Sequence, residues 1–187
     1  MHAITQSILK HKYAFIIVLT ILTGLHILWE YLNAGVTTHY PLADDSLPGI
    51  SNWWGLVSIP LISCLLVTLI QSRLRKEKYT ADEALKENEL RSVAYGFIGG
   101  LLFGISVSVL WAFRLESVLQ YWIYLPILLS LFVSVHQPEH LLGFVLGMTY
   151  TFGGVLPIGI GSVLLVISLI VNKGIRGGVL YIASKLK

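Results

Sequence analysis

The chain has 187 residues, of which 55% are apolar and only 12% are charged, and its formal net charge is +3. A soluble domain carries about 25% charged residues, so charge is too scarce here to cover a water-facing surface. The basic residues lie in short segments beside long apolar runs, a pattern that favours a membrane surface over nucleic acid. Cys64 is the single cysteine, so an internal disulfide is excluded, and it lies within an apolar run.

Four apolar runs, taken in chain order, have the length of transmembrane helices. They cover residues 13–32, 53–70, 92–113 and 118–135, and about 20 apolar residues span a bilayer. A signal peptide is the competing interpretation of the first run, but its apolar region would be about 7–15 residues long. Because the first run is longer and ends in Trp29, Glu30 and Tyr31, we predict a span that is retained.

The last apolar tract, Leu141 to Val171, carries no charged residue. As one straight helix it would be about 46 Å long, well beyond a hydrocarbon core of about 30 Å. Glycine and proline interrupt its middle, at Gly153, Gly154, Pro157, Gly159 and Gly161. We therefore predict two short spans over 139–153 and 156–171, with one tilted span as the alternative.

The charges and tryptophans give these spans an orientation. Six spans place twelve of the 13 Lys and Arg residues on one side, with only Arg114 on the other, and put all five Trp at the opposite span ends. Basic residues mark cytoplasmic loops, and indoles anchor at the headgroup level. We predict an all-α, polytopic transmembrane helical bundle in one membrane domain, with both termini cytoplasmic, most simply in a bacterial inner membrane. Five spans remain the alternative.

Residues 73–91 are the one polar segment with helix signals. Thr80 and Glu83 form a capping box, and Asp82–Lys86 and Glu87–Arg91 are oppositely charged pairs four residues apart. We predict a cytoplasmic helical segment that continues into the third span. A solvated extension of that span explains it more simply than a docking site for a partner.

Small residues recur every four positions in the third and fifth spans. Lipid tails are as apolar as leucine, so membrane helices associate where small residues let backbones approach. These stripes predict helix contacts, either within the bundle or with a second copy or another membrane protein, through Gly96, Gly100, Gly104, Gly143 and Gly147.

Polar residues gather at the outer side, where a loop over 33–52 follows the first span. His26 and Glu30 share one helical face, and His39, Asp44 and Asp45 lie in the loop. Ionisable residues within membranes are costly and are commonly functional. Imidazole and carboxylate groups suit a divalent metal, a proton relay or a bound cation. The alternative is an interfacial His–Glu hydrogen bond beside an ordinary acidic loop.

A second polar group, His136, Glu139 and His140, lies on the cytoplasmic side. With Gln137 and Pro138 it spells H-x-x-E-H, the inverted zinc-protease motif. Pro138 disfavours that interpretation because proline breaks a helix interior, whereas it suits the first turn of the fifth span. A capped turn is therefore the simplest interpretation, with a metal or lipid-headgroup site as the alternative.

The break between the last two spans is a third candidate. Interrupted spans frame the substrate site in many transporters, and hydroxyl groups lie just before the break at Thr149, Tyr150 and Thr151. A tight hairpin between two short spans is the structural alternative.

No residue is singled out as catalytic, and no cofactor-binding motif is present. The pattern slightly favours transport or permeation of a small molecule or ion. A membrane-embedded, metal-dependent enzyme acting on a lipid-type substrate is one alternative, with a divalent metal as its cofactor. A non-catalytic membrane subunit or assembly factor is another. The partners expected are the lipid bilayer and another membrane chain, not nucleic acid.

Overall fold

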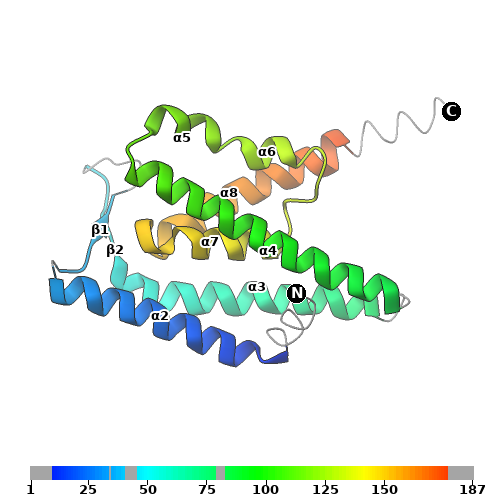
Figure 1. Cartoon of the computed structure of the whole chain (residues 1–187), viewed down its shortest axis with the longest axis horizontal. Helices are drawn as coiled ribbons and strands as arrows, with labels where there is room; N and C mark the ends of the chain where they lie inside the picture. The colour runs from blue at the N-terminus through cyan, green and yellow to red at the C-terminus, as the bar shows by residue number, and fades with distance from the viewer. Residues whose placement is uncertain (1–9, 34, 41–45, 79–82, 177–187) are drawn as a thin grey trace.

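Long helices dominate the fold. The computed structural model describes residues 10–33, 35–40, 46–78 and 83–176. Within these residues, four helices are long and apolar enough to cross a membrane: Lys12–Asn33, Asn52–Arg75, Glu87–Ala112 and Val155–Ile175. They contain α2 (Lys12–Asn33), most of α3 (Gly55–Lys78) and α4 (Glu83–Ala112), and α8 (Val155–Ile170), which lie roughly side by side along one axis (Figure 1).

A short hairpin closes one end of the bundle between α2 and α3. Strands β1 (Thr38–His39) and β2 (Ile50–Ser51) are antiparallel, with Thr38 opposite Ser51 and His39 opposite Ile50. A 3-10 turn, η2 (Asn52–Trp54), then leads into α3. We call this end of the bundle the hairpin end. Within the outer loop predicted over 33–52, Asp44 and Asp45 lie outside the described residues.

The region expected as one span over 118–135 differs from that expectation. It holds two short helices, α5 (Glu116–Trp122) and α6 (Leu125–Leu129), followed by an irregular stretch up to Gln137. Pro126 lies in the first turn of α6. Proline has no N–H to donate to the carbonyl of the preceding turn, so it suits the first turn of a helix and not its interior. One proline therefore separates the two helices.

The tract over 141–171 also contains two helices. Helix α7 (Pro138–Phe152) and α8 meet at Gly153 and Gly154, and a π-helical turn, η3 (Val171–Arg176), follows α8. Gly153 has a φ of 70°, which favours glycine. A Cβ atom on Gly154 would lie 2.9 Å from the Cα of Gly55, so this turn packs against the start of α3.

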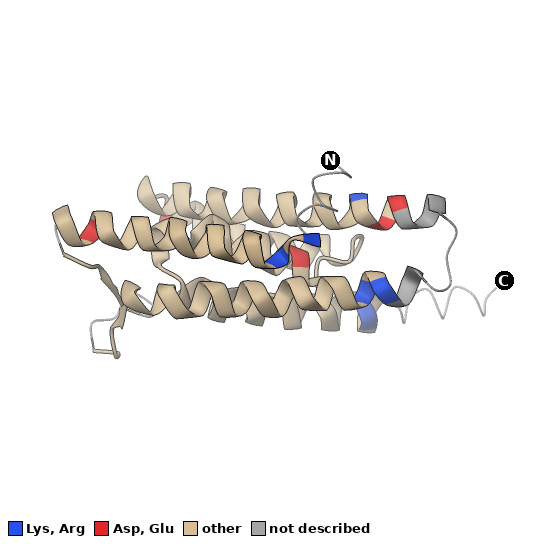
Figure 2. Cartoon of the chain, turned by 90° about the horizontal axis from the view of Figure 1, so that it is seen from below, with Lys and Arg blue, Asp and Glu red and all other residues tan. Residues whose placement is uncertain are grey.

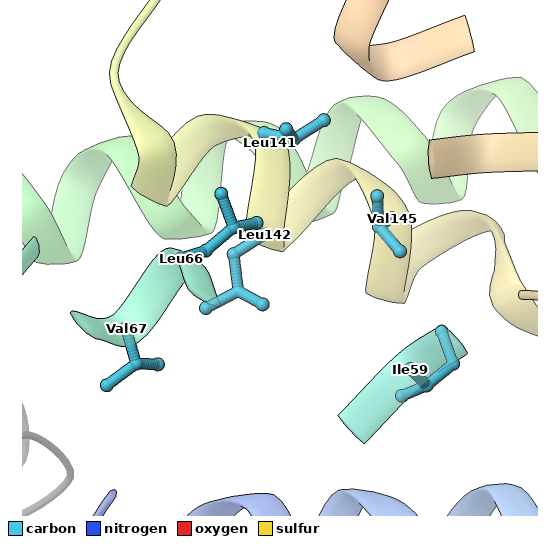
Figure 3. Close-up of a cluster of buried hydrophobic side chains, with 6 residues drawn as sticks. All are labelled: Ile59, Leu66, Val67, Leu141, Leu142 and Val145. Atoms are coloured by element: carbon cyan, nitrogen blue, oxygen red, sulfur yellow. The ribbon is translucent and has the colours of Figure 1, made fainter. Parts of the chain in front are cut away.

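Helix α7 lies at the centre, against α3, α4 and α8. Its apolar side chains form a buried cluster with those of α3, made of Ile59, Leu66, Val67, Leu141, Leu142 and Val145 (Figure 3). On its other side, α7 approaches α4 through glycines. A Cβ on Gly147 would lie 2.6 Å from the carbonyl oxygen of Leu101, and one on Gly104 would lie 2.5 Å from that of Phe144. The two backbones therefore come into near contact.

The outer surface of the bundle is apolar along the long helices. Exposed side chains include Ile17 and Leu22 on α2, Leu61 on α3, Leu102 on α4 and Val163 on α8. A contiguous apolar surface of this extent is suited to lipid and not to water. Lys and Arg gather towards the end opposite the hairpin, as the blue segments in Figure 2 show.

The polar segment predicted over 73–91 consists of the end of α3 and the start of α4. Glu87 and Arg91 form an exposed ion pair, with 2.6 Å between Oε1 and Nη2. Helix α4 runs without interruption from this segment into the apolar region. The Thr80–Glu83 capping box and the Asp82–Lys86 pair lie outside the residues whose side chains are described.

Candidate functional site

Glu30 is the centre of a polar cluster at the hairpin end. Its carboxylate accepts two hydrogen bonds from Nδ2 of Asn52, at 2.8 Å to Oε1 and 3.1 Å to Oε2. The backbone N–H of Thr37 donates to Oε2 at 3.3 Å. Nε2 of His26, one helical turn earlier, lies 3.6 Å from Oε1. Helix α2 thus supplies the charge, and the turn before α3 supplies the amide that holds it.

Asn52 connects Glu30 to His39. Its Nδ2 donates to Glu30, so Oδ1 is the atom that accepts a hydrogen bond from His39. Burial lowers the pKa of His39 below its ordinary value of 6.5, although the Glu30 carboxylate and the hydrogen bond to Asn52 act in the opposite direction. The ring of His39 is therefore neutral at neutral pH. We call His26, Glu30, His39 and Asn52 the hairpin-end cluster.

Two imidazole nitrogens in this cluster have no hydrogen-bond partner among the described residues. They are Nε2 of His26 and Nε2 of His39, and both are buried. Asn52 is the side chain that interacts with the His39 ring, and it leaves Nε2 without a partner. The cluster therefore offers two ring nitrogens and one carboxylate that can take up a proton.

Residues at and just after the end of α7 pack against this cluster. The ring of Tyr150 lies 4.7 Å from that of His26, measured between centroids. A Cβ on Gly153 would overlap Oδ1 of Asn52, so glycine is required beside the amide. Of the other residues before the break, Met148 is buried and Thr149 donates to the carbonyl of Val145 at 2.7 Å.

The structure brings together three of the five residues predicted at this side, which are His26, Glu30 and His39. Asp44 and Asp45 lie outside the described residues. Asn52, which is only 4% exposed, was not among the residues predicted from the sequence. A lone asparagine between a loop and an apolar run resembles a helix cap, and nothing local indicates that a glutamate 22 residues earlier lies against it.

A second polar cluster lies at the opposite end of α7, around Arg73. Nη2 of Arg73 is 2.8 Å from Oε1 of Glu139, whose side chain is only 2% exposed. Nη1 of Arg73 donates to Oε1 of Gln137. In the sequence, Arg73 is only one of the basic residues on the predicted cytoplasmic side, because its partners lie more than 60 residues away. We call Arg73, His136, Gln137, Glu139 and His140 the Arg73-end cluster.

The H-x-x-E-H sequence does not form one helical face. Helix α7 begins at Pro138 with Gln137 as its N-cap residue, so His136 precedes the helix. Burial lowers the pKa of His136, and the charges of Lys173 and Arg73 lower it further. His140 instead packs against Gly96, where a Cβ would lie 2.8 Å from its ring. This geometry is that of a capped helix start, not of the zinc-protease motif.

Within the described residues, no group of three or more His, Cys, Asp or Glu side chains is spaced to hold a metal ion. The two clusters lie at opposite ends of α7, as their positions in the sequence led us to expect. Together with the apolar helices, they define a helical protein with four candidate membrane spans and a hydrogen-bonded carboxylate near each end of its central helix. Comparison of the chain with protein-family models, with curated proteins and with solved structures finds no match.

Proposed function

We propose that this is a six-pass membrane protein with the hairpin end outside and both termini in the cytoplasm of a bacterial cell. The four long helices supply four passes, and the α5–α6 stretch and α7 supply the two others. Support comes from the basic residues at the Arg73 end, because Lys and Arg mark the cytoplasmic side of a membrane protein. Helix α7, one of these two other passes, has 15 residues and is thus about 22 Å long, which is shorter than the hydrocarbon core that it would cross.

The function that the geometry supports best is transport or permeation of a small cation, and the proton is the cation that the cluster suits. The observation that carries this proposal is the environment of Glu30. Its side chain is 13% exposed, and its neighbours are neutral donors and the His26 ring. Among the described residues, no Lys or Arg pairs with it. Ionisable groups placed in this way line proton and ion paths in membranes.

The two alternative functions are supported by fewer observations. A metal-dependent enzyme would place its metal in one of the two His-containing clusters, and elemental analysis of the purified protein tests this directly. An assembly factor that docks partners through glycine faces would need those faces free. Gly100 and Gly143 instead contact α7 and α4 within this chain, where a Cβ on either would overlap backbone of the facing helix.

Proton flux in liposomes tests the proposal. Purified protein is reconstituted in vesicles that contain a pH-sensitive dye, and a pH gradient is then imposed across the vesicle membrane. In part of the protein population, the hairpin end faces outwards. We expect Glu30→Gln to reduce the flux about a hundredfold or more, in the range typical of losing a positioned proton-transfer group. His26→Gln, which leaves the contact between Glu30 and Asn52 in place, should also reduce it.

Glu87→Gln is the matched control, because Glu87 is an exposed carboxylate paired only with Arg91. Its flux should equal that of the wild type. Equal flux in the wild type and in the Glu30→Gln, His26→Ala double variant would remove the cluster from the mechanism. Wild-type vesicles no more permeable to protons than empty vesicles would overturn the assignment of the proton, and the same vesicles with Na⁺ and K⁺ gradients then test the other cations.

A further inference from the structure

A cavity of about 460 Å³ lies between α4, α7, α8 and the α5–α6 stretch, away from the hairpin-end cluster and bordered at its other end by His140 of the Arg73-end cluster. Its walls are mostly apolar and include Phe103, Leu129, Phe144 and Leu164. Sites for small molecules have volumes of about 300–1,000 Å³ and mostly apolar walls. The volume and the lining are therefore those of a ligand site, and α4 and α8 hold it within two candidate spans.

The two ends of the cavity differ in their polar groups. Towards the hairpin end, the hydroxyl of Ser106 accepts a hydrogen bond from Nε1 of Trp122 at 2.8 Å and donates to the carbonyl of Phe103 at 2.7 Å. Towards the Arg73 end, Ser168 is 1% exposed, and its Oγ has no hydrogen-bond partner in the described part of the chain. His140 lines the cavity at the same end.

A buried hydroxyl without a partner is costly, by about 1–3 kcal/mol, and needs an explanation. Serine on a helix commonly donates to the carbonyl four residues earlier, as Thr149 does to Val145 here. Ser168 makes no such bond, so its hydroxyl remains available to a group inside the cavity. The Ser106 end, in contrast, already satisfies its own polar groups.

We propose that this cavity binds a single-chain amphiphile, with its one small polar group, a carboxyl or hydroxyl, at Ser168 and its hydrocarbon chain directed towards Trp122. Such a group can both accept from and donate to the serine hydroxyl. The apolar walls between the two ends then cover the chain. The site is separate from the hairpin-end cluster, so it does not depend on the transport function proposed above.

Two glycines provide a matched pair of variants for this proposal. Gly99 lines the cavity, and a Cβ there would meet nothing within 4 Å, so a leucine can project into the cavity without displacing backbone. Gly159 on α8 is equally open but does not line the cavity. Both substitutions replace a helical glycine with leucine, so they change helix propensity alike.

Quenching of Trp122 fluorescence measures the binding. The other four tryptophans are replaced by phenylalanine, and the protein in nanodiscs is titrated with a long-chain fatty acid brominated near its methyl end. We expect saturable quenching, and we expect Gly99→Leu to weaken binding about tenfold, which corresponds to about 1.4 kcal/mol. Gly159→Leu should bind as the parent does.

The polar end has its own test. Ser168→Ala should weaken binding of the fatty acid, whereas a brominated alkane without a polar group should bind equally to both proteins. Bromines near the carboxyl should quench Trp122 less than bromines near the methyl end. Unchanged binding in Gly99→Leu would overturn the site, and stronger quenching by the carboxyl-end bromines would overturn the orientation. If proton flux fails while this binding persists, only the transport proposal falls.

Discussion

Two carboxylates, one partly buried and one fully buried, each depend on one side chain from a distant part of the chain. Asn52 holds Glu30 by two hydrogen bonds, and Arg73 pairs with Glu139. A buried carboxylate without donors is strongly disfavoured, so each contact favours one alignment of its two helices. At the residue scale, Asn52 links the end of α2 to the start of α3, and Arg73 links the end of α3 to the start of α7.

The lowered pKa of His39 predicts a loss of stability in mild acid. In the unfolded chain His39 gains its proton near pH 6.5, whereas the folded chain resists protonation because the ring is buried. The unfolded state therefore binds more protons below that pH, and stability falls as the pH falls through it. Thermal unfolding in detergent should show a lower Tm at about pH 5.5 than at about pH 7.5.

His39→Asn is the informative variant, because its amide can still donate to Asn52 but does not titrate in this range. Its Tm should depend less on pH than that of the wild type. His136→Asn serves as the comparison, since burial lowers the pKa of His136 as well, and the two effects should add. An identical pH dependence in the wild type and in His39→Asn would contradict the prediction.

Removing Arg73 should cost far more than removing an exposed arginine. Arg73→Leu leaves Glu139 buried without its cation, and breaking a buried pair in this way costs about 3–5 kcal/mol. Arg91→Leu removes an exposed pair with Glu87 and should cost less than about 1 kcal/mol. Equilibrium unfolding in mixed detergents measures both. Adding Glu139→Gln should restore part of the loss in Arg73→Leu, and equal costs for the two arginines would refute the distinction.

At the scale of whole elements, the closest contact is between α4 and α7. The glycine stripes predicted from sequence lie on this contact within the chain, at Gly96, Gly100, Gly104, Gly143 and Gly147. Close backbone approach increases van der Waals contact, which is the main source of helix association when lipid replaces water. Of the helices around α7, α4 makes the most extensive contact with it, so this packing is its principal attachment.

Adjacent glycines on α4 should respond in opposite ways to alanine. A Cβ on Gly100 would overlap the carbonyl oxygen of His140, whereas one on Gly99 would meet nothing within 4 Å. Gly100→Ala should therefore destabilise the protein by about 1–3 kcal/mol through overpacking. Gly99→Ala should be neutral or stabilising by up to about 1 kcal/mol, because alanine favours helix over glycine. Similar unfolding free energies for the two variants would show that the helices are not in this contact.

For the molecule as a whole, the side of the membrane on which each connection lies is the decisive prediction. Cys64 is the only cysteine, so a Cys64→Ser background allows single cysteines to be introduced. A membrane-impermeant thiol reagent added to intact cells should label cysteines at Asn33 and Glu116. It should label those at Glu87 and Lys173 only after the cells are opened. If the cysteines introduced at Glu87 and Glu116 were labelled from the same side, the six-pass topology would be overturned.

Much of the fold follows from local properties of the sequence. The four long helices arise from the length and apolarity of their runs, and the helix start at Pro138 follows from the conformation that proline requires. The run over 118–135, predicted as one span, holds two short helices because apolar composition does not require one continuous helix. Within that apolar run, Pro126 was the local signal that sequence analysis left unused.

The sequence by itself determined that this protein is built from apolar helices with polar residues gathered near their ends, because both depend on the character of neighbouring residues. Only the tertiary structure decided which polar groups meet. Asn52 joins Glu30 and His39, Arg73 joins Glu139, and Ser168 faces an apolar cavity. Each of these arrangements depends on residues from separate elements of the fold, and the distances between them are set by how those elements pack.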